Sequence, residues 1–183
     1  MAQSSNSADT LLFYDANIVN SGQLLKGLRE GVVAVPVTED RELFELVGDA
    51  LLRTAAKHLQ LVCHGNPGRL LLGKQHITAG ELQENATTIS HWPFETIDIY
   101  ACHAGRDKDF IELLKDLSGA QIAASDGVVG HSRLGGSWQL EGARNTTVPF
   151  SREAQDSWLA TLKGPPVSNI TIGSPEEFAA FLS

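Results

Sequence analysis

Two short, predominantly apolar runs, each ending abruptly in small and polar residues, constrain the fold of this chain more than any other feature. The first run is Leu59–Cys63, which is followed by His64 and Gly65; the second is Thr96–Cys102, which is followed by a Gly-containing loop and a helical pattern. Runs of this kind are typical of parallel strands covered on both faces. Loops at the carboxyl ends of such strands carry functional groups, so we predict that His64 and Cys102 meet at one edge of a sheet.

The segments around these runs alternate between strand and helix patterns. Apolar residues between Arg41 and His58 have helical spacing, and this stretch connects a Val-rich run, Val32–Val37, to the strand at Leu59. Further strands are predicted at Leu11–Tyr14 and Gln121–Ala124. Short joins between strand, helix and strand indicate a parallel sheet. We therefore predict an α/β fold, a three-layer sandwich whose central, mostly parallel sheet carries helices on both faces.

The remaining patterns predict smaller elements. Thr78 and Glu81 match a capping box, which starts a helix running toward Ile89. The other expected elements are a hairpin formed by Arg69–Leu72 and Lys74–Ile77, a helix over Asp109–Leu117, a late strand at Ser137–Leu140 and a helix over Ser151–Leu162.

The length of 183 residues suits one domain with a full core. We expect residues 1–10 to form a disordered polar tail and residues 11–164 to form the domain. A double proline at Pro165-Pro166 then begins a linker with a short C-terminal helix, residues 165–183.

Charge and hydropathy exclude several classes of partner. The net charge of −8 and the pI of about 5.1 argue against nucleic-acid binding, which needs a basic patch. No apolar run approaches the roughly 20 residues of a membrane span, so no membrane insertion is expected. The N-terminus lacks the pattern of a signal peptide, which predicts a cytoplasmic protein or one exported as part of a larger chain.

Cys102 and His64 are the candidates for chemistry. A cysteine nucleophile must be a thiolate, which a nearby imidazole or a helix N-terminus favours, and Cys102 precedes a predicted helix. Gly65 lets the backbone approach a substrate carbonyl, and its N–H is the expected oxyanion donor. The alternative is that both cysteines are core residues.

A metal or cofactor is not expected. Cys63-His64 and Cys102-His103 suggest zinc at first sight, but adjacent residues on a strand point to opposite faces. The usual zinc-ligand spacings are also missing. Cys63 is therefore predicted to pack in the core, on the face opposite to His64.

His64-Gly65 after one strand and Tyr100-Ala101-Cys102 after another resemble the caspase-like cysteine peptidases, which include caspases, legumain, gingipain and separase. More closely, the chain resembles DUF4347, an uncharacterised bacterial domain often found in very large repeat-bearing surface or secreted proteins. The resemblance extends from Leu11 to Leu162. The sequence features that support the resemblance are His64-Gly65 with Gly68–Gly73, then Ile97–Cys102, then Leu117–Asp126, and then Leu134–Glu141, which contains a Gly-Gly-Ser-Trp string.

The resemblance implies a caspase-like fold and a cysteine endopeptidase with His64 and Cys102 as catalytic dyad. Its substrate would be a polypeptide, in cis within a larger protein or in trans. Asp126 and Asp15 follow predicted strands, and in Arg- or Lys-specific members acidic residues line the pocket for the basic side chain. We therefore expect these two carboxylates to bind substrate, with simple turn formation as the alternative. The alternative function is an inactive caspase-like module that binds or positions a partner.

Overall fold

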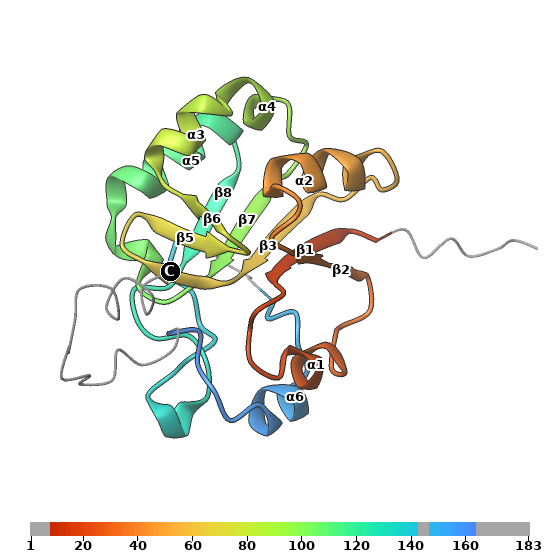
Figure 1. Ribbon diagram of the computed structural model, residues 1–183, viewed down its shortest axis with the longest axis vertical. Coiled ribbons are helices and arrows are strands. Elements are labelled where there is room, and N and C mark those ends of the chain that lie inside the picture. The colour runs from red at the N-terminus through yellow and green to blue at the C-terminus, as the bar shows by residue number, and fades with distance from the viewer. Residues whose placement is uncertain (1–7, 143–146, 164–183) are drawn as a thin grey trace, which may run out of the picture.

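The computed structural model describes residues 8–142 and 147–163. Its centre is a five-stranded sheet in which all neighbouring strands are parallel, with the order β2-β1-β3-β7-β8 (Figure 1). The strands are β1 (Thr10–Asp15), β2 (Val32–Val37), β3 (His58–Val62), β7 (Thr96–Tyr100) and β8 (Gln121–Ala124). The predicted parallel sheet is therefore confirmed.

Helices cover both faces of this sheet, as predicted. One face carries α2 (Leu43–Leu51), α3 (Ala79–Glu84), α4 (Ala86–Ser90) and α5 (Lys108–Ser118). The other face carries α1 (Ser21–Leu25) and α6 (Arg152–Ser157) (Figure 1). Successive strand residues alternate between two hydrophobic cores, so Leu61 packs into the first core and Val62 into the second.

A second, small sheet extends directly from the end of β3. It is antiparallel and contains β4 (His64–Asn66), β5 (Arg69–Leu72) and β6 (Gln75–Ile77). The predicted hairpin is present as β5 and β6, turning at Gly73, whose φ of +60° favours glycine. The pairing of β4 with β5 was not predicted; it places His64 and Gly65 in ordered extended backbone.

The predicted capping box at Thr78 and Glu81 is present at the start of α3. Two short 3₁₀ helices, η1 (Ala104–Arg106) and η2 (Ser132–Leu134), were not predicted. Among the described residues, no helix is long and apolar enough to cross a membrane.

Several sequence predictions were wrong in detail, and the helix predicted to run from Thr78 toward Ile89 is divided at Asn85 into α3 and α4. Ser137–Leu140 forms no strand, and only Glu141 after it bridges to Ala124 of β8. The helix predicted to begin at Arg41 is limited to Leu43–Leu51.

The helix predicted over Ser151–Leu162 ends at Ser157, because Trp158 turns into extended backbone and buries its ring in the second core. The tail expected over residues 1–10 includes Thr10, which instead begins β1, and its residues 1–7 lie outside the described residues. The linker and helix expected over residues 165–183 lie outside the described residues.

Candidate functional site

The ends of β3 and β7 lie side by side at the carboxyl edge of the central sheet. Val62 and Tyr100 are register partners, and the N–H of Cys63 donates to the carbonyl of Tyr100 at 3.1 Å. His64 and Cys102 each follow two residues after these partners. The structure therefore brings both residues to one edge of the sheet.

Gly65 packs closely against the end of the neighbouring strand. A Cβ atom at this position would lie 2.8 Å from the Cβ of Ala101 and 3.2 Å from the carbonyl oxygen of Cys102. Such distances leave no room for a side chain, so glycine is required for this approach. The His64-Gly65 backbone therefore packs directly against Ala101-Cys102.

The Cys102 side chain is fully buried in the second core. Its Sγ accepts a hydrogen bond from the N–H of Val129, with N···S at 3.3 Å. Burial raises the pKa of the Cys102 thiol; the Val129 N–H and the positive charge of Lys163 partly offset this rise. In this conformation, Cys102 is therefore a thiol at neutral pH.

The donor to the sulfur differs from the one predicted. The N–H groups after Cys102 bind the loop after β8, where His103 donates to the carbonyl of Gly127 at 2.8 Å and Gly105 donates to that of Ser125 at 2.9 Å. The next long helix, α5, begins only after its N-cap residue Asp107. Val129 supplies the N–H instead, from a loop 27 residues further along the chain.

His103 adopts left-handed backbone geometry, with φ of 60°. This conformation is uncommon for a residue other than glycine and turns the chain sharply after Cys102. Non-glycine residues in such conformations cluster at functional sites, where the surrounding structure holds them in place. The chain therefore bends sharply directly after Cys102, whose own side chain is buried.

The His64 side chain is half-buried, and its Nδ1 lies 2.8 Å from the carbonyl oxygen of Leu162. The N–H of Leu162 in turn donates to the carbonyl of Val129 at 2.8 Å. Val129 is the same residue whose N–H contacts Cys102. The imidazole of His64 therefore contacts the segment at Leu162, the thiol of Cys102 contacts the segment at Val129, and these two segments are hydrogen-bonded to each other.

Cys63 lies on the other side of the sheet, as predicted. It is fully buried in the first core, whereas Cys102 belongs to the second. Burial and the nearby Asp15 carboxylate raise the pKa of the Cys63 thiol. Within the described residues, no group of three or more His, Cys, Asp or Glu side chains is placed to hold a metal ion.

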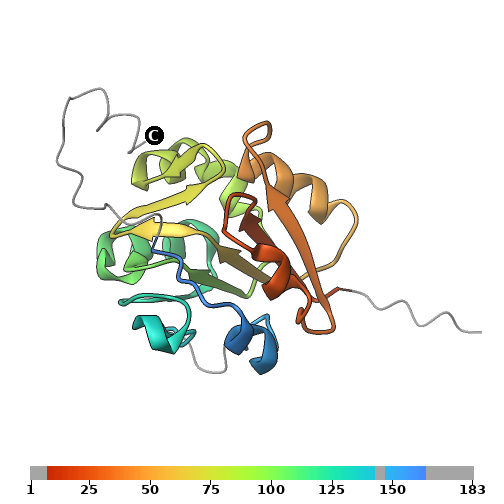
Figure 2. The same ribbon diagram turned by 60° about the horizontal axis from the view of Figure 1, so that its bottom comes forward.

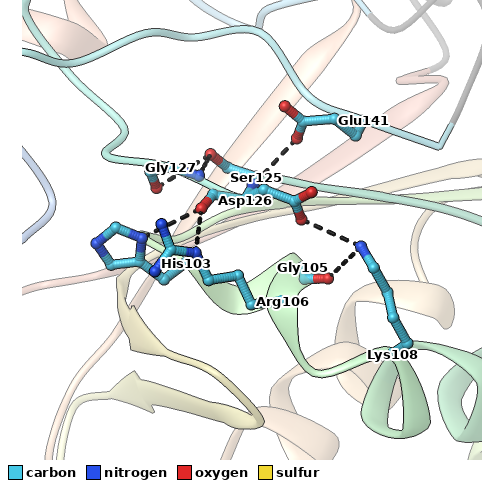
Figure 3. A network of polar contacts seen from close by, with 8 residues as sticks. All are labelled: His103, Gly105, Arg106, Lys108, Ser125, Asp126, Gly127 and Glu141. Atoms are coloured by element: carbon cyan, nitrogen blue, oxygen red, sulfur yellow. Dashed lines mark hydrogen bonds and ion pairs between the residues drawn. The ribbon is translucent and has the colours of Figure 1, made fainter.

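Asp126 lies in the loop after β8, in contact with the loop that follows Cys102 (Figure 3). Its carboxylate accepts a hydrogen bond from the ammonium of Lys108 at 3.2 Å, and its backbone carbonyl accepts one from Arg106 at 2.7 Å (Figure 3). Its own N–H donates to the carboxylate of Glu141 at 3.0 Å. The Asp126 carboxylate is therefore directed toward the start of α5.

Asp15 is buried at the end of β1. Its Oδ1 accepts hydrogen bonds from the N–H of Asn17 at 2.9 Å and of Gly73 at 3.3 Å. These bonds connect the end of β1 to the turn between β5 and β6. The contacts of Asp15 are thus those of a turn-forming residue.

Three residues of this site were not found from the sequence: Val129, Leu162 and Lys163. Each lies far along the chain from the residue that it contacts or whose pKa it affects, and none belongs to a motif with recognisable chemistry. Val129 and Leu162 appear in the sequence only as apolar residues, and their backbone atoms make the contacts.

A family model matches residues 11–162 and is described as a domain of unknown function, DUF4347. The chain belongs to the DUF4347 family. The matched region begins in β1 and ends at Leu162, so it contains His64, Cys102 and the segment that contacts them. No curated protein and no solved structure matches this DUF4347 domain.

Proposed function

We propose that this DUF4347 domain is a cysteine endopeptidase in which Cys102 is the nucleophile and His64 the general base and acid. The observation that carries the proposal is the packing of Gly65 against Ala101 and Cys102, which holds the two strand ends in direct contact. The sharp turn at His103 and the N–H of Val129 on the sulfur support it.

The proposed reaction has two steps. Cys102 Sγ attacks the carbonyl carbon of the scissile peptide bond, while the imidazole of His64 takes the thiol proton and passes it to the leaving amine nitrogen. Water then attacks the resulting thioester, with His64 taking its proton, and the thiol is released. The N–H of Gly65 is the proposed oxyanion donor, and the Val129 N–H stabilises the thiolate.

The proposed substrate is a polypeptide, in cis within a longer chain or in trans. Recognition of a basic residue by Asp126 and Asp15 stays a prediction. It requires Asp126 to exchange Lys108 for the substrate, and Asp15 already accepts two backbone hydrogen bonds.

The burial of Cys102 favours a second candidate function. The Cys102 thiol is fully buried and its pKa is raised, and a thiol in this state is unreactive. An unreactive cysteine fits a caspase-like module that binds a partner without cleaving it. The two candidates differ in whether Cys102 becomes accessible in any state of the protein.

The test uses mass spectrometry to detect cleavage of a peptide pool, or of a longer natural chain that contains the domain. Cys102→Ala and His64→Ala should each abolish cleavage, since residues that act as a unit are not additive. The matched control is Cys63→Ala, which removes a thiol from the opposite core and should lose only about 1 kcal/mol of stability. Cleavage that survives Cys102→Ala would refute the proposal, and no cleavage by any chain would favour the binding module.

A further inference from the structure

The segment Trp158–Lys163, here called the strap, follows α6 and runs toward the small sheet (Figure 2). Trp158 anchors its beginning, because the indole is fully buried and donates from Nε1 to the carbonyl of Val19 at 2.8 Å. Leu162 near its end is fully buried as well. The second core therefore holds the strap at two points.

Residues 160–162 of the strap pair with Val129–His131 through a short antiparallel bridge between Gly130 and Thr161. The N–H of His131 donates to Ala160 at 2.9 Å, and the N–H of Leu162 donates to Val129 at 2.8 Å. Between these bonds, Gly130 lies opposite the strap, and a Cβ on it would be 2.6 Å from the Ala160 oxygen. Backbone pairing of this kind is one way in which proteins bind extended peptides.

The strap also brings a peptide carbonyl to the proposed dyad. The carbonyl oxygen of Leu162 lies 2.8 Å from His64 Nδ1, and the next residue, Lys163, is near enough for its charge to act on Cys102. The Cys102 side chain is fully buried in this arrangement. A substrate must likewise place a peptide carbonyl next to the catalytic histidine, so the strap meets one of the requirements for a bound peptide.

We propose that the strap occupies the peptide-binding groove of this domain, with Leu162 in the place of the residue before the scissile bond. This inference rests on the proposed peptidase function. The Leu162 side chain lies in the apolar second core, so the fitting substrate is a peptide with an aliphatic residue at this position. This preference is an alternative to the basic residue that Asp126 and Asp15 are predicted to bind, and the two exclude each other at the same position. The domain is latent while the strap is bound, because a peptide reaches Cys102 only after the strap leaves.

The test measures iodoacetamide labelling of Cys102 in the full chain by mass spectrometry, with Cys63 as internal reference. Leu162→Ala should label at Cys102 at least about tenfold faster than wild type, because it favours local opening, while Cys63 stays slow. Leu159→Ala is the matched control, since this strap leucine is 64% exposed, and it should behave as wild type. Equal labelling in the two variants, or joint acceleration of both cysteines, would overturn the proposal.

Trp158→Phe is a second variant for the case that Leu162→Ala does not fold. It keeps an aromatic ring in the core but removes the donor to Val19, so the anchor is weakened while most of the packing remains. We expect Cys102 to be labelled faster than in wild type, with a smaller increase in rate than Leu162→Ala gives. The labelling rate of Cys63 should again stay unchanged. If Cys102 in this variant were labelled at the wild-type rate, the proposal that release of the strap exposes Cys102 would be refuted.

A synthetic peptide with the strap sequence Trp-Leu-Ala-Thr-Leu-Lys tests the groove itself. Added to Leu162→Ala, it should slow labelling of Cys102, and a version with lysine in place of its second leucine should not. Protection by the lysine version alone would overturn the aliphatic preference.

The proposed function and the groove can fail separately. Peptide-protected labelling without cleavage of any peptide would support the groove and refute the peptidase. Cleavage by wild type that Leu162→Ala leaves unchanged would support the peptidase and refute the strap.

Discussion

Gly65 and His103 are the two residues whose backbones shape the candidate site. Gly65 allows the end of β3 to pack on the loop after β7, and His103 turns that loop sharply through its left-handed conformation. Neither effect depends on a catalytic side chain. Both determine where His64 and Cys102 lie, since these are their immediate chain neighbours.

We predict that Gly65→Ala destabilises the protein by about 1–3 kcal/mol, as overpacking does, because the added methyl meets Ala101 and Cys102. It should also remove any peptidase activity. Gly48→Ala in α2 is the matched control, because nothing lies within 4 Å of its added methyl, and it should be neutral or stabilising. Urea unfolding measures both. Equal stability of the two variants would contradict the close approach at Gly65.

At the scale of elements, the start of α5 determines the course of the loop after Cys102. The side chain of Asp107 accepts a hydrogen bond from the N–H of Phe110 at 3.0 Å and so caps the helix. Phe110 packs into the first core, while Lys108 on the same turn contacts Asp126. The Asp107 cap therefore fixes where the loop after Cys102 ends and α5 begins.

Removing this cap by Asp107→Ala should cost roughly 0.5–2 kcal/mol, the usual range for an N-cap acceptor. Asp107→Asn should retain most of the stability, because asparagine caps helices about as well as aspartate. Thermal unfolding of the two variants gives the comparison. An Asp107→Asn variant as unstable as Asp107→Ala would show that the negative charge, rather than the cap, matters.

At the scale of the whole molecule, the second face of the sheet contains a buried polar pair. Gln60 of β3 donates from Nε2 to the carboxyl group of Asp98 at 3.1 Å, and both side chains are buried. Burial raises the pKa of the Asp98 carboxyl, and Gln60 and the nearby His58 only partly offset the rise. Ionised Asp98 therefore lowers the stability of the folded state at neutral pH.

Asp98→Asn should consequently be more stable than wild type at pH 7. An acid whose pKa is higher in the folded state takes up its proton there first, so the penalty begins to shrink as the pH falls through that pKa and is gone below the pKa of the unfolded chain. The advantage of Asp98→Asn should thus shrink toward pH 4, as measured by the difference in Tm. Asp116→Asn on the exposed face of α5 is the control, with a small difference throughout. A variant less stable than wild type at pH 7 would show that the Asp98 charge is paired.

The sequence by itself determined the five parallel strands, the helices between them and the edge at which His64 and Cys102 lie. Apolar periodicity records which faces of each element are buried, and the rules of parallel sheets then place successive strand ends together. The opposite orientation of Cys63 also followed from a local rule, the alternation of side chains along a strand.

Only the tertiary structure decided what faces the thiol and the imidazole. The contacts of Val129 with Cys102 and of Leu162 with His64 join residues 27 and 98 positions apart, and they use backbone atoms that every residue possesses. Local sequence patterns do not encode such partners. The same holds for the end of α6, where burial of Trp158 and pairing of the strap with Val129–His131 outweigh the helical pattern of Ser151–Leu162. Intrinsic helix preferences are small, and packing and backbone pairing within the whole fold override them.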